Sequence, residues 1–85
     1  MSLNDNMSFQ GRELHVQTEN VQSSPPCIRT HVFSRGRIIH TKTFAFDSDV
    51  KDWNDFGKIR DMMQKQHRNV IEKIAQQQSK IQNTP

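Results

Sequence analysis

The stretch HVFSRGRIIHTKTF, from His31 to Phe44, carries the clearest pattern in the chain. β-Branched and aromatic residues dominate both halves of it, which is typical of β-strands. Arg35 and Gly36 lie between the halves, and glycine supplies the positive φ that a tight hairpin turn needs. The stretch therefore predicts an antiparallel hairpin with strands over about residues 27–34 and 37–46.

The residues before this hairpin predict one further strand. Residues 12–19, RELHVQTE, alternate so that Leu14, Val16 and Thr18 share one face. A loop rich in serine and proline follows, and strands that are consecutive in sequence usually pair with each other. We therefore expect a three-stranded antiparallel meander. Residues 1–11 are polar and show no period, so they are predicted to be a flexible tail.

The C-terminal part of the chain changes to a helical period. From about residue 50, apolar residues recur at steps of three and four, which predicts a long helix over about 50–82 with Trp53 and Phe56 anchoring its start in the core. A helix over residues 54–82 would be roughly 43 Å long, whereas strands of eight residues span roughly 27 Å. The expected fold is α+β, in the order β-β-β-α, as one domain over 12–83 with an overhanging helix.

The composition suggests that this domain shares its core with a partner. The chain has 85 residues and only 32% of them are hydrophobic, so a single copy can bury little apolar surface. The overhanging apolar seam of the helix would be covered most simply by a second copy. We therefore expect a homodimer, or a complex with an unidentified protein. The predicted seam comprises Met63, His67, Val70, Ile71, Ile74 and Ile81.

Several function classes find no support in the sequence. No apolar run approaches the roughly 18 residues of a membrane span, and the first residues do not resemble a signal peptide. Cys27 is the only cysteine, which excludes an internal disulfide and favours a reducing cytoplasm. No Cys/His signature, phosphate loop or paired carboxylate is present. The sequence therefore predicts a non-enzymatic cytoplasmic protein without a cofactor.

The histidines of the quoted stretch suggest a metal site as an alternative. If Arg35 and Gly36 form the whole turn, His31 faces His40, and a simple pairing of the first two strands would place His15 beside His31. Three imidazoles on neighbouring strands could hold a zinc ion. However, the neighbouring Arg29 and Lys42 would repel a cation, so the histidines are better interpreted as the polar face of a sheet.

The basic residues of the hairpin suggest a second alternative, nucleic-acid binding. The net charge is +3, and Phe33 and Phe44 could stack on bases. The competing interpretation is a basic hairpin that keeps an exposed strand from aggregating. The residues concerned are Arg29, Arg35, Arg37 and Lys42.

A resemblance to other proteins covers residues 12–46. The strand HVQTE, the double proline and THVFSRGRIIHTKTF together resemble a set of short, uncharacterised bacterial domains. The resemblance implies a bacterial cytoplasmic protein, and it carries over no activity, cofactor or catalytic residue. The sequence as a whole therefore predicts a small protein-interaction or assembly module.

Overall fold

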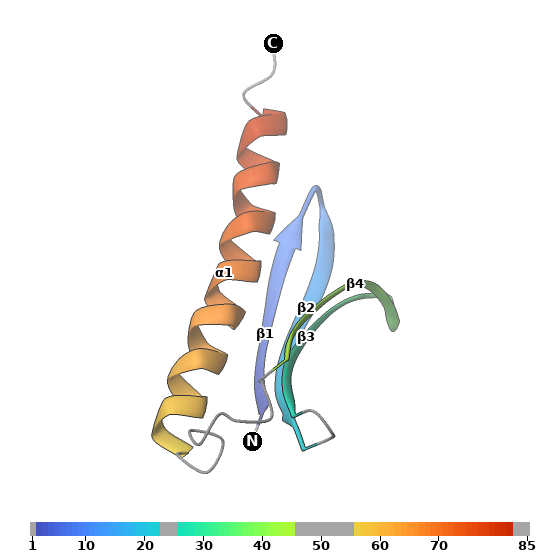
Figure 1. Cartoon of the computed structure of the whole chain (residues 1–85). Coiled ribbons are helices and arrows are strands. Elements are labelled where there is room, and N and C mark those ends of the chain that lie inside the picture. Colours follow the sequence, from blue (N-terminus) through green and yellow to red (C-terminus); the bar gives the residue numbers. More distant parts are fainter. Residues whose placement is uncertain (1, 23–25, 46–55, 83–85) are drawn as a thin grey trace.

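The chain forms one antiparallel sheet with a long helix across one face, an α+β arrangement (Figure 1). The computed structural model describes residues 2–22, 26–45 and 56–82, with side chains up to Gln77. The strands follow one another in the sheet in the order β1-β2-β3-β4. The elements are β1 (Ser2–Phe9), β2 (Arg12–Val21), β3 (Cys27–Ser34), β4 (Arg37–Ala45) and α1 (Phe56–Gln82).

The expectation of a three-stranded sheet is wrong, because β1 adds a fourth strand where the sequence predicted a flexible tail. β1 pairs with β2 along its whole length, from Ser2 opposite Glu19 to Phe9 opposite Arg12. Leu3, Met7 and Phe9 contribute apolar side chains to the core. Asp5 interrupts this apolar set, which concealed the strand period from the sequence. The other three strands lie close to their predicted positions.

Two tight turns join the strands in pairs. Gln10 and Gly11 have φ of 51° and 77°, and Arg35 and Gly36 have φ of 53° and 78°. Two successive residues with positive φ are the mark of a type I′ hairpin turn, so the predicted turn at Arg35 and Gly36 is confirmed. A left-handed conformation costs a residue with a side chain about 1 kcal/mol. Both turns lie at the same end of the sheet, because successive strands run in opposite directions and the two turns are one strand pair apart.

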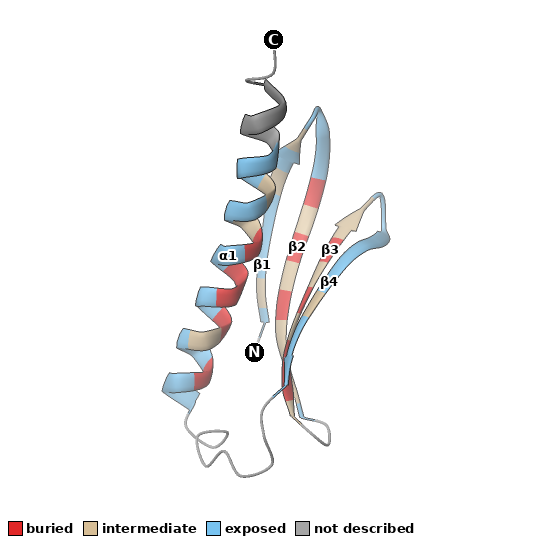
Figure 2. Ribbon diagram, turned by 45° about the horizontal axis from the view of Figure 1, so that its top comes forward, coloured by how far each residue is buried: buried red, intermediate tan, exposed pale blue. Residues whose placement is uncertain are grey.

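The core lies between α1 and the central strands. One cluster of buried residues contains Leu14, Val16, Val32 and Val70, and a second contains Ile28, Ile59 and Met63. Helix α1 packs over β1, β2 and β3. β4 reaches α1 through side-chain contacts, with Lys42 bonded to Asn69 and the Lys42 carbonyl oxygen bonded to Gln66, but Figure 2 shows the strand mostly in the colour of exposed residues. The helix therefore covers only part of the inner face of the sheet.

The register of the strands differs from the simple one expected. A bulge in the β3–β4 pairing places Phe33 opposite Ile38 but Val32 opposite His40, which makes Ile39 an extra residue in β4. The β2–β3 pairing places His15 opposite Phe33. The expected facing of His31 with His40, and of His15 with His31, is therefore wrong.

The end of α1 at Gln82 agrees with the predicted end of the helix near residue 82. Its predicted start near residue 50, with Trp53, lies outside the described residues. Phe56 is 69% exposed, so the expectation that it anchors the core is wrong. The far end of α1 extends past the β1–β2 hairpin (Figure 1). Among the described residues no helix is both long and apolar enough to cross a membrane.

Candidate functional site

A chain of hydrogen bonds crosses the buried interface between α1 and the sheet. His67 Nε2 lies 2.7 Å from Asp5 Oδ2, and His67 Nδ1 lies 2.7 Å from Thr18 Oγ1. Thr18 Oγ1 lies 2.7 Å from Thr30 Oγ1. Gln66 Nε2 lies 3.0 Å from Thr30 Oγ1 and also near the carbonyl oxygen of Ile28. Gln66 Nε2 also lies 3.2 Å from the carbonyl oxygen of Lys42 on β4, so these hydrogen bonds link α1 to all four described strands.

These bonds are all satisfied when they run in one direction. The two backbone carbonyl oxygens of Ile28 and Lys42 can only accept, so the NH2 group of Gln66, which only donates, must occupy this place rather than its amide oxygen. It donates to Thr30, whose hydroxyl donates to Thr18, whose hydroxyl donates to His67 Nδ1. His67 Nε2–H then donates to the Asp5 carboxylate. A neutral imidazole with its proton on Nε2 completes this arrangement.

The order carboxylate, imidazole, hydroxyl is also found where an enzyme activates a nucleophile. Here, however, the side chains of Thr18 and Thr30 are 0% exposed, so no substrate can reach either hydroxyl. Only Asp5 reaches solvent, with 60% of its side chain exposed. The chain of bonds therefore fixes the helix on the sheet and does not form an accessible site.

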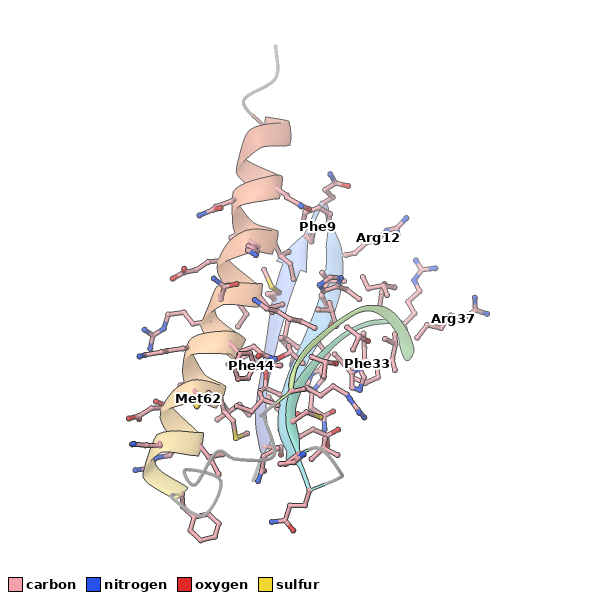
Figure 3. All side chains as sticks on the ribbon, viewed as in Figure 1. Phe9, Arg12, Phe33, Arg37, Phe44 and Met62 are labelled. Carbon is pink, nitrogen blue, oxygen red and sulfur yellow. The ribbon has the colours of Figure 1, made fainter. Side chains whose placement is uncertain are left out.

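The outer face of the sheet, away from α1, carries a group of rings. Phe33 lies between His15 and His31, with ring centroids 6.1 Å and 5.9 Å away. Figure 3 shows Phe33 on the side of the sheet opposite the helix. Both ring nitrogens of His15 contact amide oxygens, at 2.8 Å from Asn6 and 3.1 Å from Asn4. The His15 ring is thus held in place on β2.

The predicted histidine row is not formed. His31 lies opposite Gln17 and Thr41, and its Nδ1 is 3.0 Å from the Thr41 hydroxyl. His40 lies opposite the buried Val32, on the helix side of the sheet. Within the residues that the structure describes, no group of three or more His, Cys, Asp or Glu side chains is placed to hold a metal ion.

The basic residues of the hairpin do not form one cluster either. Arg35 lies at the β3–β4 turn, and Arg37 extends from the same end of the sheet (Figure 3). Arg29 lies beside Cys27, with Nη2 4.0 Å from its sulfur. Lys42 donates to Asn69 Oδ1 on α1, at 3.1 Å. The predicted set is therefore divided between the two faces and the two ends of the sheet.

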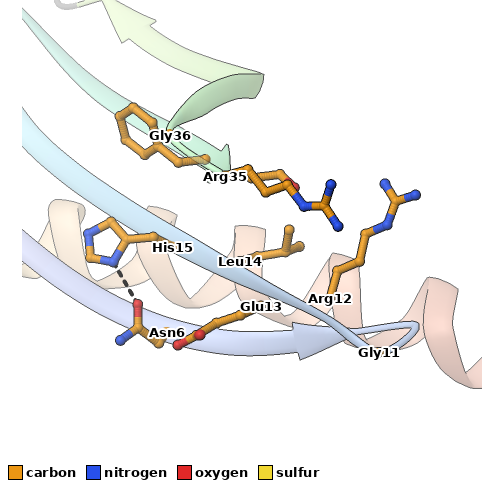
Figure 4. Close-up of a pocket in the computed structure, with 10 residues that line it drawn as sticks. Asn6, Gly11, Arg12, Glu13, Leu14, His15, Arg35 and Gly36 are labelled. Carbon is orange, nitrogen blue, oxygen red and sulfur yellow. Dashed lines mark hydrogen bonds between the residues drawn. The ribbon is translucent and has the colours of Figure 1, made fainter.

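Arg12, which was not among the basic residues predicted from the sequence, lies near Arg35 in the structure. Both residues line a hollow of about 390 Å³ between the two hairpin tips. His15 and Phe33 line the same hollow. Figure 4 shows both arginine side chains reaching to the same side of the sheet. The Gln10–Gly11 turn was the signal that could have revealed this arrangement, because it makes a second hairpin end beside the first.

The predicted helix seam faces the chain's own sheet. Met63, His67 and Val70 are buried there, and Ile71 and Ile74 pack half-buried against the same core. The side chain of Ile81 lies outside the described residues. Most of the seam is thus occupied within one chain.

Among the described residues, three of the four exposed large apolar side chains lie on β4, and the fourth is Phe56 on α1. Ile38, Ile39 and Phe44 are 53%, 58% and 48% exposed. Beside β4 runs a groove of about 350 Å³ under α1. Its lining combines apolar and cationic side chains, among them Phe9, Ile39, Val70, Ile74, Lys42 and Lys73. The adjacent apolar pair Ile38–Ile39, which breaks strict alternation, was the sequence signal for this surface.

Cys27 is free and buried, which leaves its thiol shielded from reagents. The surfaces open to a partner are therefore the β4 edge with its groove and the outer face near the hairpin tips. No protein-family model matches the chain, and neither a curated protein nor a solved structure matches it.

Proposed function

We propose that this protein is a small non-enzymatic interaction module that forms a homodimer through the edge of β4. The observation that supports this proposal is an edge strand of nine residues with three large, half-exposed apolar side chains. β4 ends the strand order, so within the described sheet it pairs with β3 on one side only. An edge of this kind is a template for pairing with another strand.

The two edges of the sheet differ in how they are protected. At the β1 edge, α1 packs over the strand, and the exposed positions carry serine, asparagine and aspartate. At the β4 edge α1 contacts the strand near Lys42, through Asn69 and Gln66. It leaves Ile38, Ile39 and Phe44 about half-exposed. The bulge at Ile39 disturbs only one end of β4, so the pairing from His40 to Ala45 is regular. The β4 edge is therefore the better surface for association.

A second copy fits this edge by symmetry. Two β4 strands related by a twofold axis run antiparallel, which continues the antiparallel sheet. Because the axis reverses the strand, the end that carries Ile38 and Ile39 meets the end of the partner strand that carries Phe44. Apolar side chains of both copies would then cover one another, which removes them from water. The groove beside β4 would lie next to this new interface.

The proposal assigns a binding role rather than catalysis. The described residues contain one carboxylate–imidazole–hydroxyl chain, formed by Asp5, His67 and Thr18. Its hydroxyl, on Thr18, is buried and cannot be reached by a substrate, which supports a role in binding. A buried, free Cys27 suits a reducing compartment, and we propose the cytoplasm as the location.

The first test is the mass of the protein in solution. We expect light scattering to give twice the chain mass of 10.0 kDa for the natural protein. Replacing Ile39 with lysine is expected to shift the mass to that of one chain, because an edge lysine opposes strand pairing. A monomeric natural protein, or an Ile39→Lys variant that stays dimeric, would contradict the proposal.

Phe56→Lys is the matched control for this test. Phe56 is even more exposed than Ile39, at 69% against 58%, but it lies at the start of α1, away from β4. Both changes remove one exposed hydrophobic residue and add one charge. The control is expected to remain dimeric, and an equal loss of dimer in both variants would show that general surface apolarity drives association.

A further inference from the structure

We propose that the hollow between the two hairpin tips binds single-stranded nucleic acid. In this site Arg12 and Arg35 hold phosphate groups, while Phe33 stacks against a base on the outer face of the sheet. The proposal does not depend on the dimer, since these residues lie at the hairpin end of the sheet, with only Phe33 on its outer face. The proposal is based on the charges and the aromatic rings that line the hollow.

The first argument is the charge inside the hollow. Arg12 and Arg35 come from different hairpins and line the same space, where like charges repel one another unless an anion lies between them. Glu13 is the only carboxylate among the described residues of this lining. Its side chain extends from the same face of β2 as His15, whereas Arg12 extends from the opposite face at the hairpin tip (Figure 4), so the two guanidinium groups lie away from this carboxylate. A phosphate oxygen would satisfy the arginine donors, which suit it geometrically.

The second argument is the ring cluster beside these arginines. Phe33 and His15 line the hollow, and the two histidine rings flank Phe33 at 5.9 Å and 6.1 Å. Contacts with Asn4 and Asn6 fix the His15 ring. An aromatic side chain on an open antiparallel sheet is a recurring platform on which proteins stack unpaired bases. The combination of phosphate donors and a ring distinguishes a nucleotide chain from a simple anion.

The position of Arg35 in its turn makes a clean test of the proposal possible. Its φ of 53° is a conformation that glycine or asparagine adopts more easily. A substitution at this position can therefore remove the charge and relax the backbone together. This provides a test that separates binding from folding, because a glycine variant is expected to fold at least as well as the natural protein.

The shape of the site favours a single strand over a duplex. The outer face offers a sheet with half-buried rings, and bases inside a duplex cannot reach such rings without unstacking. The hollow of about 390 Å³ is a half-open depression between the two hairpin tips, which leaves both of its sides accessible to a continuing strand. One nucleotide can thus occupy the hollow while its neighbours continue along the sheet.

The experiment measures binding of a labelled oligothymidylate of about ten nucleotides by fluorescence anisotropy at several salt concentrations. We expect binding that weakens with salt, with a slope of about −0.7 for each phosphate held. A duplex of the same length is expected to bind more weakly. Absence of binding at about 50 mM salt would overturn the proposal.

The variants separate the two parts of the site. Arg35→Gly is expected to weaken binding roughly five- to tenfold at low salt and to make the salt slope shallower by about 0.7. Phe33→Ala is expected to weaken binding roughly five- to 100-fold and to leave the salt slope unchanged. Thermal unfolding of each variant shows whether it is folded.

Lys65→Gln is the matched control, because it removes one charge from an exposed position on α1, on the other side of the sheet. Its binding is expected to equal that of the natural protein. If Lys65→Gln weakens binding as much as Arg35→Gly, the attraction is general and the proposed site is wrong. If heparin competes fully and a folded Phe33→Ala variant binds normally, the hollow is a site for polyanions without base stacking, which also overturns the proposal.

Discussion

Replacing His67 with alanine is expected to lower the free energy of unfolding by about 3 kcal/mol. The change removes the acceptor of the Thr18 hydroxyl, which is 0% exposed and cannot turn to water. An unsatisfied buried hydroxyl costs about 1–3 kcal/mol. The lost imidazole also leaves a cavity between α1 and the sheet, and it frees Asp5 from its contact with the helix.

Urea unfolding at a fixed protein concentration measures this effect, since the stability of a dimer depends on concentration. His67→Gln is the informative control, because the glutamine amide offers both an acceptor for Thr18 and a donor for Asp5. We expect it to recover part of the stability. Asp5→Asn is expected to cost less than about 1 kcal/mol, because the Asp5 side chain is largely in solvent. An alanine variant as stable as the natural protein would show that the hydrogen-bond chain does not hold the helix.

Replacing Met63 with alanine is expected to lower the free energy of unfolding by about 2–5 kcal/mol. Met63 is 0% exposed and packs with Ile28 and Ile59 in the second core cluster. The whole domain is expected to be stable by only about 4–13 kcal/mol, given typical values for each residue. The loss should therefore lower the melting temperature by more than about 10 °C.

Its neighbour Met62 provides the comparison in the same turn of the helix. Met62 is only half-buried at the edge of that cluster, so alanine there should cost about 1 kcal/mol. Both variants change the same side chain on the same helix, so helix propensity affects them equally. Equal losses at the two positions would show that the second cluster is packed differently from this description.

The sequence alone predicted most strands, because alternation is a local property. β2, β3 and β4 carry β-branched and aromatic residues, and their bounds were predicted to within a few residues. β1 was missed for two physical reasons. Serine and asparagine are poor strand formers, and Asp5 occupies an inward position that looks polar until its partner is known. That partner, His67, is 62 residues away in the chain.

The register could not be predicted, because it depends on details that the pattern does not carry. A bulge at Ile39 shifts His40 to the inner face of the sheet. A hairpin with this bulge and one without it have the same sequence, so the pattern cannot distinguish the two registers. The pairing of β2 with β3 is offset by two positions from the expected one, which moves His15 from His31 to Phe33. A proposed three-histidine site needed both registers to be right.

The candidate surfaces were harder still to derive from the sequence. An apolar helix seam is required both for packing on a sheet and for binding a partner, so its residues alone cannot distinguish the two. Here the sheet takes up Met63, His67 and Val70. Conversely, the exposure of Ile39 and the approach of Arg12 to Arg35 depend on where the helix and the hairpins lie. Both arise from tertiary structure.

The order β1-β2-β3-β4 also has a consequence for folding. Each strand pairs with the next one along the chain, so the hairpins can close locally, on a scale of about 1–10 μs. Docking of α1 joins residues as distant as Asp5 and His67, and it comes after a much larger loss of chain entropy. Until then Leu14, Val16 and Val32 face water on a bare sheet. A chain that stops after Ala45 therefore holds all four described strands and is still expected to aggregate, since the helix covers the apolar face of the finished sheet.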